Sequence, residues 1–278
     1  MVSQVEDVLA FAPKVNRVTD ALFRPVERYF APRSFGLDNI PNDRPVLFVG
    51  NHTIYGVLDP ILILRSIHKS TGRLPRALAD HMHFNVPGWT PYIESMGIVE
   101  GTREICSALM ADRQSVLVFP GGAREVFKRK GESYKLVWKE RLGFIQMALE
   151  HGYDIVPFAS VGPDNAYSVW WDAEDIDGLL SQRIKQSGFY QKVLRNGDLI
   201  PPVARGLGLS VIPRPEKFYF SFGEPISLAS ANSSSDKEVL MALRNQVAEA
   251  IENQIGELLL IREQDTDKSL LRKILTAL

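Results

Sequence analysis

The strongest constraint on the fold is an alternation of short apolar segments with segments of helical periodicity. Five of the apolar segments have the length and composition of buried strands, at residues 46–50, 77–80, 115–119, 154–160 and 217–222. Helical patterns follow the first three, at residues 60–68, 102–112 and 140–150. Strands that alternate with helices favour an α/β fold in which a mostly parallel central sheet is flanked by helices.

The N-terminal part of the chain carries a separate amphipathic pattern. Apolar residues recur at helical spacing through residues 5–30, and Pro13 and Pro25 are expected to break the helix. We therefore predict an N-terminal amphipathic helical segment at residues 1–38, followed by a single larger domain at residues 39–278.

The sequence leaves two roles open for this N-terminal segment. Its apolar face can pack on the domain core, or it can lie in a membrane interface with Phe11, Phe23 and Phe30 among the acyl chains. Both roles use the same helical spacing, so periodicity does not choose between them.

Charge and cysteine content exclude several classes of protein. The 32 Lys and Arg residues nearly balance the 33 Asp and Glu residues, which gives no general electrostatic reason to bind nucleic acid. The single cysteine, Cys106, cannot form an intramolecular disulfide, and its place in an apolar helical pattern favours a buried, inert thiol. No apolar run is long enough to span a bilayer, and the N-terminus lacks a secretory pattern. We expect a cytoplasmic protein, peripheral to the inner face of a membrane.

His52 is the first candidate for chemistry, because it directly follows the predicted strand at residues 46–50. A neutral imidazole can act as a general base, and a carboxylate on its other nitrogen would orient the ring, a role that Asp59 can take. The alternative is that His52 caps a turn and Asp59 caps the helix that begins at Pro60. Spacing alone leaves both interpretations open.

A second candidate site is FPGGARE, which follows the predicted strand at residues 115–119. Gly121 and Gly122 let backbone amides approach an anion, and Arg124 adds a guanidinium group suited to phosphate. The alternative is a tight turn followed by a solvated charged face, with Glu125 and Glu132 as ion-pair partners. Because parallel strands end at one edge of a sheet, we expect this turn to lie near His52.

Four segments in this order resemble the four blocks of the glycerolipid acyltransferase superfamily: VGNHTIYGVLDP, GTRE, FPGGAREV and IVPFASVG. The resemblance covers residues 46–165. The GGARE form of the third block, together with ADHMHFNVPG, GESYKL and FYFSFGEPI, is similar to the diacylglycerol acyltransferase-like branch, which includes the plastid phytyl ester synthases.

The resemblance implies transfer of a fatty acyl group from a thioester to a hydroxyl group. His52 and Asp59 would be catalytic, and substrate binding would fall to Asn51, Arg103, Gly121, Gly122, Arg124 and Glu125. No cofactor or metal is implied. The expected partners are an acyl-coenzyme A or acyl carrier protein donor, a lipid acceptor and a membrane surface.

The chain departs from the lysophosphatidate acyltransferases at two places. They have four residues between the histidine and the aspartate, whereas six separate His52 from Asp59. They also have glutamate and threonine where this chain has Gly121 and Ala123. The second departure favours a neutral acceptor, such as monoacylglycerol, diacylglycerol or a long-chain alcohol. The alternatives are a lysophospholipid acyltransferase, a thioesterase or lipase, and a lipid-binding protein with a decayed site.

Weaker signals lie elsewhere in the chain. His81 and His83 can face one side of a strand, but no third metal ligand of suitable spacing accompanies them, which favours a structural role. Trp170 and Trp171 can line an acyl channel, sit at a lipid interface or pack in the core.

The C-terminal part is predicted to hold an insertion and a closing helix. Residues 170–215 are irregular and are expected to form an insertion over the sheet, with a polar helix at residues 175–185. Ser235 and Glu238 have capping-box spacing and would open a long amphipathic helix that closes the domain.

Overall fold

The computed structural model describes residues 2–11, 17–85, 90–229, 236–267 and 270–277. Its centre is a seven-stranded sheet in the order β1-β9-β6-β2-β5-β3-β4. Every neighbouring pair is parallel except β6 and β9, so the predicted mostly parallel sheet is confirmed. The strands are β1 Arg33–Phe35, β2 Leu47–Gly50, β3 Arg76–Ala79, β4 Ile98–Glu100, β5 Val116–Val118, β6 Ile155–Val161 and β9 Tyr219–Phe222.

All five predicted strands form, and β1 and β4 are additions. Each of these two spans three residues, which is too short to show a period in the sequence. β1 lies inside the predicted segment 1–38 and pairs in parallel with β9, so this segment contributes directly to the sheet.

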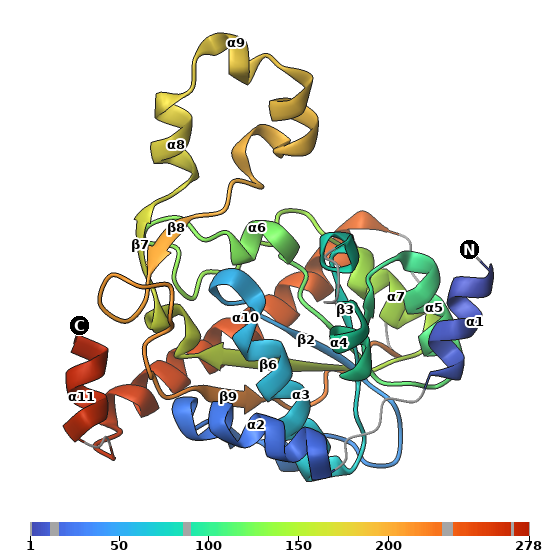
Figure 1. Cartoon of the computed structure of the whole chain (residues 1–278). Coiled ribbons are helices and arrows are strands. Elements are labelled where there is room, and N and C mark those ends of the chain that lie inside the picture. The colour runs from blue at the N-terminus through green and yellow to red at the C-terminus, as the bar shows by residue number, and fades with distance from the viewer. Residues whose placement is uncertain (1, 12–16, 86–89, 230–235, 268–269, 278) are drawn as a thin grey trace.

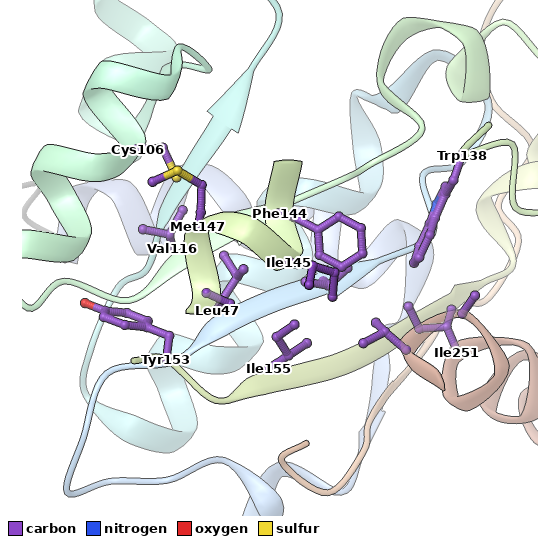
Figure 2. Packing of buried hydrophobic residues seen from close by; sticks show 14 of the residues in the cluster. Leu47, Cys106, Val116, Trp138, Phe144, Ile145, Met147, Tyr153, Ile155 and Ile251 are labelled. Atoms are coloured by element: carbon purple, nitrogen blue, oxygen red, sulfur yellow. The ribbon is translucent and has the colours of Figure 1, made fainter. Parts of the chain in front are cut away.

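Helices cover both faces of the sheet (Figure 1). The alternation of side chains along β2 shows how the two faces fill, because Leu47 belongs to one hydrophobic cluster and Phe48 to the other. The cluster that contains Leu47 includes Trp138, Phe144, Tyr153 and Ile251 (Figure 2). The helices on its side are α1 Val2–Ala10, α5 Arg103–Ala111, α7 Gly143–His151 and α10 Lys237–Gln264.

The cluster that contains Phe48 lies on the other face. It is rich in phenylalanine, because Phe158, Phe218, Phe220 and Phe222 all contribute to it. Its covering helices are α2 Arg17–Phe30, α3 Leu58–Thr71 and α4 Thr90–Ser95. The shorter elements near the sheet are η1 Leu37–Asn39, η2 Ile54–Gly56, η3 His81–Asn85, α6 Gly122–Val126, η4 Pro163–Ala166 and, at the C-terminal end, α11 Leu270–Ala277.

The N-terminal helix α2 packs on the core. Phe30 is buried, and its ring stacks on Phe218 with 4.3 Å between centroids. The Phe23 ring lies beneath the guanidinium of Arg65, which also donates to Asp20 and Glu27. The membrane role is therefore excluded for Phe30, whose ring is buried, and the Phe23 ring is partly covered by Arg65. Phe11 is exposed, and for it the membrane role stays a prediction.

The two predicted helix breaks have different outcomes. Pro25 lies within α2 without ending it. Proline has no N–H to donate to the carbonyl group four residues earlier, and because this part of the helix is exposed, water can take the place of that donor. Pro13 lies outside the described residues, as does Ser235 of the predicted capping box. At α10 the observed cap is Asp236, whose side chain accepts from the backbone N–H of Glu238.

Residues 168–215 are called the insertion below; their middle part projects away from the sheet, and the segment after residue 205 returns toward it (Figure 1). The strands β7 Ser168–Trp171 and β8 Val203–Arg205 form an antiparallel ribbon at its base. Beyond the ribbon lie α8 Ala173–Leu179, α9 Gln182–Lys185, η5 Phe189–Val193 and η6 Arg195–Gly197. The expected position over the sheet is thus wrong.

The single helix predicted at residues 175–185 is also wrong. Asp172 forms a capping box with Asp175 and starts α8 earlier, and extended backbone at Leu180 and Ser181 separates α8 from α9. Among the described residues, no helix has both the length and the apolarity needed to cross a membrane.

Candidate active site

Two strands deliver the two candidate motifs to one edge of the sheet. β2 ends just before His52, and its parallel neighbour β5 ends just before Phe119. The two rings stack with 3.9 Å between centroids and an angle of 10° between planes. The prediction that His52 and the Gly-Gly turn meet at the same edge is confirmed.

His52 and Asp59 lie within reach of each other despite their six-residue separation. His52 Nδ1 is 3.3 Å from Asp59 Oδ2, and the same oxygen accepts the backbone N–H of Thr53. Tyr55 and Gly56 take positive φ values of 62° and 59°, which folds the additional residues into the single turn η2. Asp59 is fully buried in the first turn of α3 rather than at its N-cap. A carboxylate on Nδ1 leaves Nε2 available to a substrate.

Gly56 is a site residue that the sequence analysis missed. A Cβ atom at this position would lie 2.5 Å from His52 Cε1 and 2.7 Å from Val126 Cγ1. The imidazole is therefore held between the Phe119 ring and the Gly56 backbone. The sequence did contain a signal for this role, because Gly56 lies in the loop between His52 and Asp59.

His52 forms part of the wall of an apolar cavity of about 300 Å³. The cavity runs between α3, β3, α4 and α6, with side chains such as Ile61, Ile93 and Met96 in its lining. A cavity of this composition fits a hydrocarbon chain.

His83 also lines this cavity, and burial lowers its pKa, which favours the neutral imidazole. His81 instead is mostly exposed and lies 2.9 Å from Asp80. Within the described ranges no group of three or more His, Cys, Asp or Glu side chains is placed to hold a metal ion.

The Gly-Gly turn has less freedom to bind an anion than its sequence suggested. Gly122 donates its backbone N–H to Phe119 O, so Gly121 is the remaining amide donor of the pair. A Cβ at Gly121 would lie 1.8 Å from Glu125 Oε2, which shows that the Glu125 carboxyl group fills the space beside this glycine.

Arg124 is engaged inside the protein. Its guanidinium donates to both carboxylate oxygens of Glu132 at 2.9 and 2.6 Å, and Asp198 lies 3.5 Å from its Nε. These partners, Glu132 foremost, raise the pKa of Arg124. The side chain is buried and is not part of the cavity lining.

The two other predicted binding residues lie away from the cavity. Asn51 is buried and exchanges two hydrogen bonds with the backbone of Ser160, which ties the ends of β2 and β6 together. Arg103 is exposed and pairs with Glu150 between α5 and α7, on the opposite face of the sheet from the cavity.

A buried polar cluster beneath the His52 loop was also missed. Asp164 accepts the backbone N–H groups of Ile54 and Tyr134 at 2.7 and 2.8 Å, and Lys128 Nζ lies 3.7 Å from the same carboxylate. Burial raises the pKa of Glu125 to about 8, and Lys128 opposes this shift. The alternative of a solvated charged face is therefore wrong for Glu125, which is buried, and Lys128 in the same segment is buried as well. Basic runs in a sequence rarely reveal such a buried lysine.

Cys106 and the pair Trp170 and Trp171 differ in their burial. Cys106 is buried on α5 as predicted, and burial raises the pKa of its thiol to about 11, which favours the unreactive protonated form. Trp170 and Trp171 are about half exposed, so core packing is excluded for them.

Comparisons with known proteins match the part of the chain that holds this site. The family model described as Acyltransferase matches residues 32–161, a range that includes the His52–Asp59 pair and the Gly-Gly turn. Phytyl ester synthase 2, chloroplastic, of Arabidopsis thaliana is 32% identical over 264 residues, which cover 86% of this chain and 36% of that protein. The human protein named DGAT1/2-independent enzyme synthesizing storage lipids is 31% identical over 122 residues, or 44% of this chain and 37% of that protein.

Over residues 32–161 the chain belongs to the acyltransferase family of enzymes. It spans about a third of the length of the phytyl ester synthases that it matches. Among solved structures, the 1-acyl-sn-glycerophosphate acyltransferase PlsC from Thermotoga maritima aligns with a TM-score of 0.48 and 15% identity, covering 92% of this chain and 87% of that one.

Proposed function

We propose that this enzyme transfers a fatty acyl group from a thioester to the hydroxyl group of a neutral lipid. Monoacylglycerol, diacylglycerol or a long-chain alcohol would serve as the acceptor. The observation that carries the proposal is that His52, paired with the buried Asp59, lies in the wall of an apolar cavity. A base placed beside a pocket for a hydrocarbon chain suits a reaction between two lipid substrates.

In the proposed reaction, His52 Nε2 removes the hydroxyl proton as the acceptor oxygen attacks the thioester carbonyl. Asp59 holds the ring through Nδ1 and stabilises the imidazolium that forms. The Gly121 N–H is the proposed donor to the oxyanion of the tetrahedral intermediate. Its collapse breaks the carbon–sulfur bond, and the imidazolium returns the proton to the leaving thiolate. Cys106 takes no part, because it lies on a helix of the opposite face.

The environment of Arg124 supports a neutral acceptor. Binding a phosphate through this guanidinium would require it to leave Glu132 and Asp198. The names of the two relatives refer to phytyl esters and storage lipids, which point in the same direction. The donor, acyl-coenzyme A or acyl carrier protein, and a cytoplasmic location peripheral to a membrane stay predictions.

The test is an acceptor panel with labelled long-chain acyl-coenzyme A and, separately, acyl carrier protein. The acceptors are lysophosphatidate, monoacylglycerol, diacylglycerol, a long-chain alcohol and none, and the lipid products are separated. We expect a neutral ester that disappears in His52→Ala and persists in His151→Ala, a matched control on α7.

Three results would contradict the proposal. Esterified lysophosphatidate as the main product would show that the acceptor is a lysophospholipid rather than a neutral lipid. Free fatty acid formed at the same rate without an acceptor would indicate a hydrolase. Lipid binding without turnover, unchanged in His52→Ala, would indicate a binding protein.

A further inference from the structure

The insertion carries most of the exposed apolar bulk of the described chain. Fifteen large hydrophobic side chains are exposed among the described residues, and nine of them fall within residues 170–212. They are Trp170, Trp171, Leu179, Ile184, Phe189, Val203, Leu209, Val211 and Ile212. Such a concentration in 43 of 278 residues marks a surface that meets an apolar phase or a partner.

The acidic side chains of the insertion are engaged within the protein. Most form ion pairs: Glu174 with Arg129, Asp175 with Lys130, Asp177 with Lys185, and Asp198 with Lys139. Asp172 is buried and accepts the Lys130 backbone N–H. Three of these acids therefore hold the insertion against the 129–130 segment, and their charge is balanced locally.

The basic side chains at the far end behave differently. Arg183, Lys192 and Arg195 are exposed, and in the part of the chain that the structure describes they form no ion pair. The outward charge of the insertion is thus positive and is interleaved with exposed apolar groups such as Phe189.

We propose that the insertion docks on an anionic lipid membrane. Trp170, Trp171 and Phe189 enter the interfacial layer, and Arg183 and Lys192 lie against lipid phosphates. Tryptophan suits this layer because its ring is apolar and its N–H is polar, and basic side chains are drawn to anionic headgroups. An acidic protein would match the charge but would not account for the apolar side chains between the cations.

The base of the insertion lies beside the cavity. Tyr55, which lines the cavity, donates its hydroxyl to Pro202 O at 3.0 Å and meets the Tyr167 ring edge-on. A docked insertion would therefore bring the cavity close to the lipid surface. The purpose of docking, which is access to lipid substrates, rests on the proposed function, whereas the docking itself rests on exposure and charge.

The test is flotation with phosphatidylcholine vesicles that contain or lack phosphatidylglycerol. One variant removes apolar contacts (Trp170→Ser, Trp171→Ser, Phe189→Ser), and its matched control removes exposed apolar groups elsewhere (Phe11→Ser, Tyr92→Ser, Leu260→Ser). A second variant reverses two charges of the insertion (Arg183→Glu, Lys192→Glu), and its control reverses two exposed charges outside the insertion (Arg24→Glu, Arg73→Glu).

We expect the wild type to float with the anionic vesicles and to dissociate as salt rises. Both insertion variants should bind about tenfold more weakly or worse, and both controls should bind as the wild type does. Equal losses in a control and its matching variant would overturn the proposal. Binding to acyl carrier protein but not to vesicles, lost on charge reversal, would also overturn it.

A parallel assay with detergent-dispersed acceptor separates the two proposals. The docking variants should form ester there at the wild-type rate. Flotation without ester formation by the wild type would overturn the proposed function alone. Ester formation without flotation would overturn the docking surface alone.

Discussion

Two regions of the molecule differ in where their polar and apolar side chains lie: the sheet edge at His52, and the insertion. At the edge, the polar groups are buried and turned toward each other: Asp59 holds His52, and Asp164 holds the backbone of Ile54. In the insertion, Phe189 and Trp171 are exposed, and acidic side chains form ion pairs that hold it against the 129–130 segment.

This difference indicates which region suits catalysis and which suits contact with another phase. A buried carboxylate that holds an imidazole or a backbone N–H fixes a reactive group in one geometry, which suits catalysis. A surface that leaves apolar rings and cations exposed gains its stabilisation from another phase. The following predictions sharpen or break this contrast, starting with the largest expected effect.

Two lysines, two positions apart, contact the two regions. Lys128 is buried beside Asp164, whereas Lys130 is half exposed and pairs with Asp175 of the insertion. We expect Lys128→Met to lower the free energy of unfolding by about 3 to 5 kcal/mol, because a buried carboxylate loses its counter-charge. Urea denaturation measures this loss. Lys130→Met is the control and should leave the urea midpoint near that of the wild type. A wild-type midpoint for Lys128→Met would break the contrast.

Gly56 tests how closely the edge holds its base. Gly56→Ala should lower kcat/KM for ester formation about 100-fold, because the new methyl group displaces His52. The control Gly72→Ala has a similar positive φ, 69°, but nothing within 4 Å of the new atom. It should lose stability through backbone strain yet keep its activity. Equal losses of activity in Gly56→Ala and Gly72→Ala would show that backbone strain, and not displacement of His52, lowers kcat/KM.

Glu125 tests the buried charge balance through pH. The folded protein keeps its proton up to about pH 8, whereas an unfolded chain releases it near 4.5, because burial raises this pKa. The stability that this proton contributes is therefore full below pH 4.5 and is lost as the pH rises toward 8.

Relative to Glu125→Gln, the wild type should lose about 1.4 kcal/mol of unfolding free energy per pH unit between about pH 5 and pH 7. Urea denaturation at several pH values measures this slope, with the exposed Glu249→Gln as the matched control. Parallel curves for the wild type and Glu125→Gln would show that Glu125 is ionised in the fold.

The smallest effect is expected on the insertion. Trp170→Ser with Trp171→Ser should change the free energy of unfolding by no more than about 0.5 kcal/mol, because both rings are half exposed. Thermal unfolding in the absence of lipid measures it. A loss of several kcal/mol would mean that the tryptophans support the fold rather than meet a second phase.

The sequence predicts the core strands because they are buried on both faces and therefore apolar throughout. It also places His52 at the correct edge, because parallel strands end on the same side. It leaves the role of α2 open, since an amphipathic face that packs on Phe218 has the same spacing as one that meets a membrane.

The site is only partly predictable for a related reason. The pairing of His52 with Asp59 depends on the positive φ values of Tyr55 and Gly56, and a spacing rule does not contain them. The burial of Lys128 depends on Asp164, a residue 36 positions away that belongs to another element. Long-range burial of this kind leaves no local pattern in the chain.

The most direct test of the account is a double-mutant cycle on His52→Ala and Asp59→Asn, read as kcat/KM for ester formation with unchanged folding confirmed by thermal unfolding. The account predicts a loss of about 10³-fold for His52→Ala, a smaller loss for Asp59→Asn, and no further loss when both are combined. Fully additive losses, or ester formation that persists in His52→Ala, would contradict a base and an acid that act as one unit.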